Sequence, residues 1–134
     1  MHGCNGLFES DGIAVAHYAS WGRVLREAGY LVLLVDSLGS RGIASLCGSR
    51  GPSPIRWEQL SSDAYGALAY LKQRADVRAS AIAVMGWSMG GDAVLRTISD
   101  ESAARPAGLL SNFSAAIAFY PGGCARLARE GNWS

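Results

Sequence analysis

The sequence has almost no net charge and no long apolar run. Twelve Lys and Arg residues stand against eleven Asp and Glu residues, which gives a formal net charge of +1 over 134 residues. A balance this even indicates neither nucleic acid nor an anionic membrane surface as a partner. The longest apolar runs, YLVLLV and AAIAFY, are far shorter than the roughly 20 residues that span a bilayer. A composition of 49% hydrophobic and 17% charged residues is typical of a soluble globular protein.

The first residues carry no recognisable targeting signal. The start MHGCNGLFESDG has neither the basic segment nor the apolar segment of a signal peptide, so a cytoplasmic location is the default expectation. A length of 134 residues fits one domain, and we expect residues 1–134 to form a single domain.

Cysteine is scarce, and its spacing suits neither zinc nor a redox pair. Cys4, Cys47 and Cys124 are odd in number and far apart. Three free thiols are the default expectation. A bridge between Cys47 and Cys124, which both follow predicted strands, is the alternative for an oxidising compartment.

The apolar patterning predicts a mostly parallel α/β sheet with helices on both faces. Residues 30–35, 81–86 and 115–120 are apolar throughout, as strands covered on both faces are. Helical patterns separate these runs, which is the arrangement of βαβ units. With a stub at the start of the chain, the sheet would have about four strands.

Three helices are expected between the predicted strands. The first carries an apolar stripe from Tyr18 to Ala28 and stops at Gly29. The second starts near Ser53 and Pro54, because proline is tolerated in the first helical turn. The third runs from Ser88 or Met89 to about Ile98. The other members of the stripes are Trp21, Leu25, Trp57, Leu60, Ala64, Leu68, Leu71, Val94 and Leu95.

The stretch GWSMG, Gly86 to Gly90, fits the pattern G-x-S-x-G of a nucleophile on a sharp turn between a strand and a helix. Small flanking residues avoid clashes at such a turn, and the turn presents the Ser88 hydroxyl above the sheet. The Met89 N–H, at the start of the following helix, is a candidate oxyanion donor. A glycine-rich turn without chemistry is the alternative interpretation, although the flanking strand and helix favour the nucleophile.

A second glycine-rich stretch, HGCNG from His2 to Gly6, precedes the first helix. Such a loop brings a backbone N–H against the nucleophile and completes an oxyanion hole. Cys4 or Asn5 would supply that N–H. For His2 we expect a structural role, and for the Cys4 thiol no catalytic one.

The combination of HGCNG, GYLVLLVDSLGSRGIASLCG, GWSMGG and AIAFYPGGC resembles the dienelactone hydrolase family of α/β hydrolases, in order and in spacing. The resemblance covers nearly the whole chain. It implies an α/β-hydrolase sheet, hydrolysis of a carboxylic ester or lactone, and no metal or cofactor. By position it makes Ser88 the nucleophile and the Met89 and Cys4 amides the oxyanion donors. The partner it implies is a small-molecule ester or lactone.

The sequence departs from that family at both ends. The family has strands before the HG motif, and an acid and a histidine after AFYPG, whereas here the histidines are His2 and His17. We therefore expect an incomplete domain whose last apolar strand is an edge that promotes self-association. A catalytically inactive remnant or interaction module is the alternative, and a third possibility is that a partner chain supplies the acid and histidine.

Several other polar residues near the predicted site are weighed and left without a catalytic role. His17 is expected to be solvated on the polar side of its helix, and Asp92 to complement a helix N-terminus. Asp36 has no histidine to orient. Arg41 is either a solvated loop residue or a partner for a substrate carboxylate. Trp87 is expected to pack beside the nucleophile.

Overall fold

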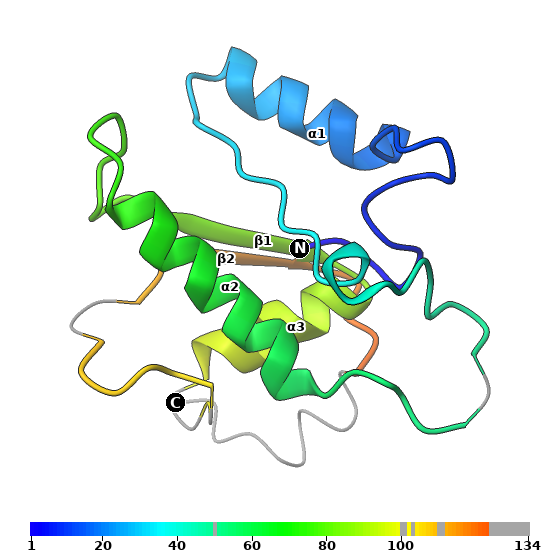
Figure 1. Ribbon diagram of the computed structural model, residues 1–134. Helices are drawn as coiled ribbons and strands as arrows, with labels where there is room; N and C mark the ends of the chain where they lie inside the picture. The colour runs from blue at the N-terminus through cyan, green and yellow to red at the C-terminus, as the bar shows by residue number, and fades with distance from the viewer. Residues whose placement is uncertain (50, 100–101, 103, 110–111, 124–134) are drawn as a thin grey trace.

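The computed structural model describes residues 1–49, 51–99, 102, 104–109 and 112–123, and within them the chain is a mixed α/β structure with a small parallel sheet. Figure 1 shows α1 on one side of the sheet and α2 with α3 on the other. No helix in these ranges is long and apolar enough to cross a membrane. The elements in chain order are α1 (Ala16–Glu27), the 3-10 turn η1 (Gly39–Arg41), α2 (Trp57–Lys72), β1 (Ala83–Trp87), α3 (Met89–Ile98) and β2 (Ala115–Phe119).

The sheet consists of β1 and β2, which pair in parallel with Trp87 opposite Phe119. Side chains alternate between the two faces of a strand. On one face, Trp87 and Phe119 stack on each other with ring centroids 5.5 Å apart, and Trp21 of α1 covers both. On the other face, Gly86 lies against the first turn of α3. The apolar run of β1 is continuous because α1 covers one face of the strand and α3 covers the other.

Two of the three predicted helices begin and end close to their predicted positions. α1 ends at Glu27, and Gly29 follows with a φ of +88°, the left-handed conformation that favours glycine at a helix end. α3 begins at Met89 and ends at Ile98, as predicted.

The predicted start of the second helix is wrong by three residues. Ser53 forms a local turn instead, in which its hydroxyl donates to the Ile55 carbonyl and accepts the Ile55 N–H. The helix starts at Trp57, where the Arg56 N–H donates to Oε1 of Gln59 at 2.8 Å. A side chain that satisfies a backbone N–H before the first turn fixes the helix start more strongly than a nearby proline. The predicted inward residues Leu60, Ala64 and Leu68 are buried.

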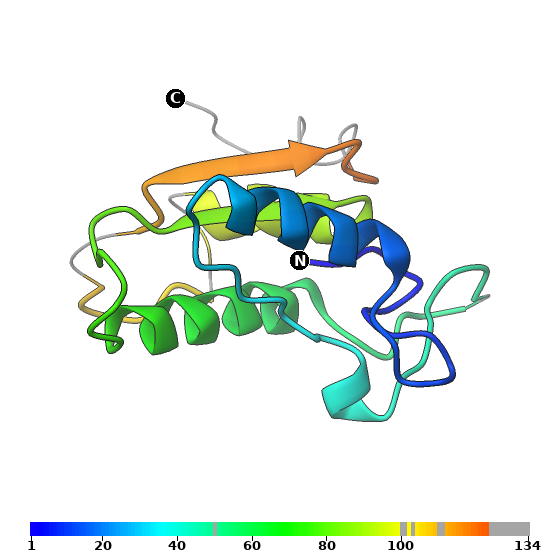
Figure 2. The same cartoon turned by 90° about the horizontal axis from the view of Figure 1, so that it is seen from above.

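Residues 30–35 do not form the predicted strand, and the sheet has two strands among the described residues rather than the expected four or so. Residues 31–36 are extended and connect α1 to η1, but they lie outside the sheet (Figures 1 and 2). Within the described part of the chain, no backbone N–H of residues 31–35 donates to another backbone group. Leu31, Leu33 and Leu34 remain 45%, 38% and 39% exposed. A strand needs a neighbour to pair with, and none of the described segments pairs with this one.

The second edge of β1 is occupied by a single residue, Met1. The Met1 amino group donates to the Met85 carbonyl at 2.7 Å, and the Met1 carbonyl accepts the Trp87 N–H at 3.3 Å. Burial lowers the pKa of this amino group from 8.0 to about 6. Through this pairing the start of the chain is fixed beside the end of β1, where the candidate site lies.

Candidate functional site

Ser88 lies on a sharp turn between β1 and α3. Its backbone has φ +51° and ψ −115°, a conformation that costs a residue with a side chain about 1–3 kcal/mol. The Ser88 N–H donates to the Phe119 carbonyl at 3.0 Å, and the Ser88 carbonyl accepts the Asp92 N–H at 2.9 Å. The strand, the kinked residue and the helix predicted from the G-x-S-x-G pattern are therefore all present.

The glycines on both sides of Ser88 are required by close backbone contacts. A Cβ atom on Gly90 would lie 2.5 Å from the carbonyl oxygens of Met1 and His2, and a Cβ atom on Gly86 would overlap the backbone of Gly90. The turn can close only where both positions lack a side chain. The two glycines of the G-x-S-x-G pattern are therefore required because larger residues would clash with the backbone, as predicted from the sequence.

The Ser88 hydroxyl is not used to cap the helix that follows it. Serine at the residue before a helix usually accepts a hydrogen bond from an N–H of the first turn. At Ser88 the side chain forms no such bond, and the residue is half-buried rather than enclosed. The hydroxyl is therefore not engaged in a structural role at the helix terminus.

Two backbone N–H groups, one in the first residue of α3 and one in the loop packed against Trp87, are also without a structural role. In the part of the chain that the structure describes, neither the Met89 N–H nor the Cys4 N–H donates to another group. Met89 is the first residue of α3, where the helix dipole places partial positive charge. The loop that carries Cys4 approaches the turn through its preceding residues, since a Cβ atom on Gly3 would lie 3.5 Å from the Trp87 carbonyl.

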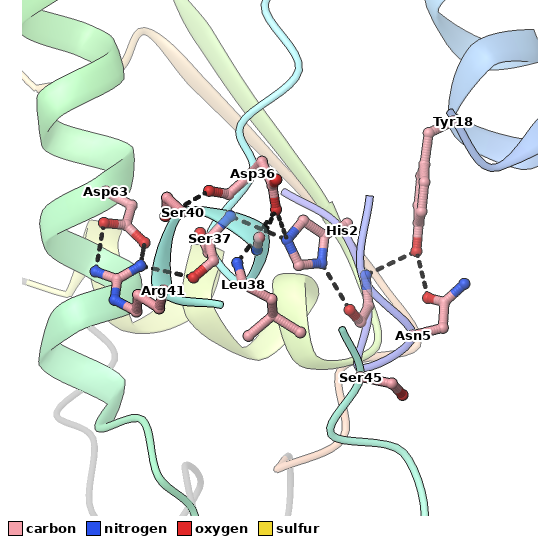
Figure 3. A network of polar contacts seen from close by, with 12 residues as sticks. His2, Asn5, Tyr18, Asp36, Ser37, Leu38, Ser40, Arg41, Ser45 and Asp63 are labelled. Atoms are coloured by element: carbon pink, nitrogen blue, oxygen red, sulfur yellow. Dashed lines mark hydrogen bonds and ion pairs between the residues drawn. The ribbon is translucent and has the colours of Figure 1, made fainter. Parts of the chain in front are cut away.

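His2 holds this loop against the segment that follows residues 30–35, and Figure 3 shows the contacts. Its Nε2 accepts the Ser37 N–H at 3.0 Å, so the proton is on Nδ1, which donates to the Gly3 carbonyl at 2.7 Å. The residue is 3% exposed, and burial lowers the pKa of His2 although Asp36, 3.6 Å away, opposes this. Both ring nitrogens are engaged, which agrees with the expected structural role.

The expectation of three free thiols is wrong for two of the cysteines. Cys4 and Cys47 form a disulfide with their Cα atoms 5.0 Å apart. The bond joins the loop at 2–6 to the loop after η1, and the Leu46 N–H donates to the Cys4 carbonyl at 2.7 Å beside it. Their separation of 43 residues left no local signal for this pairing. The alternative bridge between Cys47 and Cys124 is excluded, because Cys47 is already bonded to Cys4. Cys124 itself lies outside the described residues.

The remaining candidate bases and acids have other contacts. His17 is exposed on α1, and its ring lies edge-on to the Trp87 indole with centroids 5.1 Å apart. Asp36 accepts the N–H groups of Leu38 and Gly39, which forms the turn that leads into η1. Asp92 is 1% exposed, lies 3.5 Å from the Arg96 guanidinium and contacts the loop at Gly123.

Arg41 is exposed in its loop, as one of the two alternatives predicted, but its guanidinium is paired with another side chain. Its guanidinium forms two hydrogen bonds of 2.8 Å with the Asp63 carboxylate of α2, and a third to the Ser37 carbonyl at 2.6 Å (Figure 3). Asp63 is distant in sequence and no motif marked it as a partner. Trp87, in contrast, is 7% exposed and packs beside Ser88 in the aromatic cluster, as predicted.

Among the described residues, no cluster of metal-ligating side chains lies at Ser88. The described residues contain no group of three or more His, Cys, Asp and Glu side chains that would hold a metal ion. An open hollow of about 510 Å³ lies between residues 33–36 and α2, and its lining includes none of Cys4, Ser88 and Met89. The candidate site is therefore the turn itself with its two N–H groups.

Comparison with known proteins gives no relative from which a function can be transferred. No family model, no curated protein and no solved structure matches the chain.

Proposed function

We propose that this chain carries the nucleophile and oxyanion hole of a serine hydrolase of the dienelactone hydrolase type, with an α/β-hydrolase architecture and a carboxylic ester or lactone as substrate. Ser88 Oγ attacks the carbonyl carbon, and the Met89 and Cys4 N–H groups stabilise the oxyanion that forms. The bond to the leaving oxygen then breaks, and that oxygen takes up the serine proton. Water cleaves the acyl-serine and releases the acid.

The observation that carries the proposal is the state of the Ser88 hydroxyl. Ser88 has a strained φ of +51°, stands at a helix start and yet does not cap the helix. Strain and an unused hydroxyl at one residue are characteristic of a functional position rather than a structural one. The N–H groups of Met89, which follows Ser88, and of Cys4, in the loop packed against Trp87, donate to no other group among the described residues and supply the two donors that an oxyanion hole requires.

The base is the part of the mechanism for which these residues offer no candidate. Both nitrogens of His2 are engaged, and His17 lies against Trp87 without a hydrogen bond to Ser88. A serine without a base keeps about 10³–10⁴-fold acceleration over water from the oxyanion hole and binding. We therefore propose that full turnover requires an imidazole supplied from outside residues 1–134.

A fluorophosphonate probe tests the nucleophile directly. Ser88 Oγ would displace fluoride from phosphorus, which leaves a stable phosphonyl-serine that mass spectrometry assigns to one peptide. We expect slow labelling of the folded wild-type chain at Ser88, supported by the oxyanion hole alone, and none in Ser88→Ala. Ser62→Ala is the matched control, because Ser62 lies on α2 with its hydroxyl bonded to the Glu58 carbonyl.

The remaining outcomes separate the alternatives. Labelling that is equal in Ser88→Ala and wild type contradicts the proposal. Absence of labelling in folded protein supports an inactive remnant or interaction module. Labelling that appears only after addition of a polypeptide with an acid and a histidine supports completion of the site by a partner chain.

A further inference from the structure

We propose that Tyr18 of α1 is a positioning residue for the oxyanion hole, which fixes the loop that presents the Cys4 N–H. The inference rests on the function proposed above. The Tyr18 hydroxyl accepts the Gly3 N–H at 2.7 Å and donates to Oδ1 of Asn5 at 3.0 Å. One hydroxyl thus bonds the residues immediately before and after Cys4 (Figure 3).

The two hydrogen bonds determine how the peptide groups around Cys4 are oriented. The Gly3 N–H directed at Tyr18 fixes the plane of the peptide between His2 and Gly3, and the bond to Asn5 restrains the chain on the other side of Cys4. An oxyanion donor is effective only when its N–H is aimed in advance at the developing charge. The Cys4 N–H belongs to the peptide between Gly3 and Cys4, whose carbonyl accepts a hydrogen bond from His2 Nδ1. Tyr18 bonds the residues on both sides of this peptide, and loss of these bonds would let the loop shift and move the Cys4 N–H from that position.

Tyr18 contacts the turn at Ser88 as well as the loop. Its ring lies against the Trp87 ring with centroids 5.6 Å apart, and Trp87 directly precedes Ser88. The side chain is 5% exposed, so water does not compete for its hydroxyl. Burial raises the pKa of the Tyr18 phenol, and the hydroxyl keeps its proton and both hydrogen bonds at neutral pH. Tyr18 therefore connects the loop directly to the residue that precedes the nucleophile.

The loop is also held from the side opposite to Tyr18. The Cys4–Cys47 disulfide and the Leu46 N–H, which donates to the Cys4 carbonyl at 2.7 Å, restrain the Cys4 side chain and carbonyl. Neither contact involves the Gly3 N–H or the Asn5 side chain, which bond Tyr18. Removal of the Tyr18 hydroxyl is thus expected to alter the orientation of the loop while the disulfide keeps it in place.

The test is the rate at which a fluorophosphonate labels Ser88 in Tyr18→Phe, resolved into the maximal rate kinact and the half-saturating probe concentration KI. The phosphoryl oxygen occupies the oxyanion hole as its charge develops. We expect kinact to fall about tenfold, while KI changes less than twofold. This fall in kinact is smaller than the loss of about 10²–10³-fold that deletion of an oxyanion donor causes. A purely structural role would lower the melting temperature without this split.

Tyr70→Phe is the matched control, because it makes the same chemical change at a tyrosine that is 51% exposed and bonded to Arg74. It should label at the wild-type rate. A second variant pair examines the bond to Asn5: Asn5→Asp, which keeps an acceptor, should exceed Asn5→Leu in kinact.

The outcomes distinguish this inference from the function on which it rests. If wild type labels and folded Tyr18→Phe labels with the same kinact, the role of Tyr18 is refuted and the proposed nucleophile stands. If wild type labels neither alone nor after addition of a polypeptide with an acid and a histidine, both are refuted. A rise in KI at unchanged kinact refutes the positioning role, since it would place Tyr18 in binding of the probe.

Discussion

Nε2 of His2 accepts the backbone N–H of Ser37 at 3.0 Å, which joins the start of the chain to the segment after residues 30–35. A protonated imidazole has no lone pair for this bond. The buried ring must therefore stay neutral for the two segments to remain joined, and the fold gains a dependence on pH.

We expect the free energy of unfolding to decrease as the pH falls through and below 6.5. Burial lowers the pKa of His2 in the folded chain, so the unfolded chain takes up the proton first. The stabilisation is complete above the unfolded pKa and is lost as pH falls toward the folded one. The Met1 amino group, with its pKa of about 6, acts in the same direction. Urea unfolding from pH 8 to 5 should show a weaker pH dependence in His2→Gln than in the wild type, and an equal pH dependence in the two proteins would contradict this prediction.

The Cys4–Cys47 bond should contribute measurably to stability. A disulfide that closes a loop of this length contributes about 2–4 kcal/mol, because it restricts the unfolded chain. A reductant is expected to lower the melting temperature of the wild type but not that of Cys47→Ser. Equal effects of the reductant on both proteins would show that the bond does not form.

Two glycine substitutions should have opposite effects. Gly90→Ala places a methyl group 2.5 Å from the Met1 and His2 carbonyls, and because these are backbone atoms we expect a loss of about 1–3 kcal/mol or more. Gly22→Ala lies inside α1 with no atom near the added methyl group, and should stabilise by about 0.5–1 kcal/mol. Chemical denaturation of the two variants compares them directly. A Gly90→Ala variant as stable as wild type would contradict the tight contact at the turn.

Strain at Ser88 should be visible in stability measurements. Ser88→Gly relieves a φ of +51°, and we expect it to be about 1 kcal/mol more stable than Ser88→Ala, which keeps the strain. Ser88→Ala itself should lie within about 0.5 kcal/mol of wild type, because the hydroxyl does not cap α3. A large decrease in the free energy of unfolding of Ser88→Ala, measured by denaturation, would indicate that the hydroxyl has a structural role instead.

The open edge of the sheet predicts self-association. Among the described strands β2 pairs only with β1, and its Ile117 is 42% exposed. Exposed apolar strand edges recruit other chains, and a lysine there opposes this. Light scattering after size-exclusion chromatography should show association that decreases in Ile117→Lys. Ile13→Lys is the control, since Ile13 is 66% exposed but lies outside the strands; a monomeric wild type would contradict the prediction.

The parts of the site that were predicted best are those with short-range causes. The turn at Ser88 follows from contacts between residues 86 and 90, and the ends of α1 and α3 follow from adjacent residues such as Gly29. The start of α2 was missed because a side chain of Gln59, rather than Pro54, decides it. The sequence placed Tyr18 on the inward apolar stripe of its helix. No pattern indicated that its hydroxyl would bond Gly3, 15 residues away.

The alternation of apolar segments and the strained serine between β1 and α3 follow from the amino-acid order alone, because they depend on periodicity and on contacts within a few residues. Three-dimensional packing was needed to establish that residues 30–35 stay outside the sheet, that Cys4 bonds Cys47 and that Arg41 pairs with Asp63. Each of these depends on which distant segment lies alongside, and the same residues would behave otherwise beside a different neighbour. A strand, a disulfide and an ion pair are properties of two segments, whereas a turn or a helix end is a property of one.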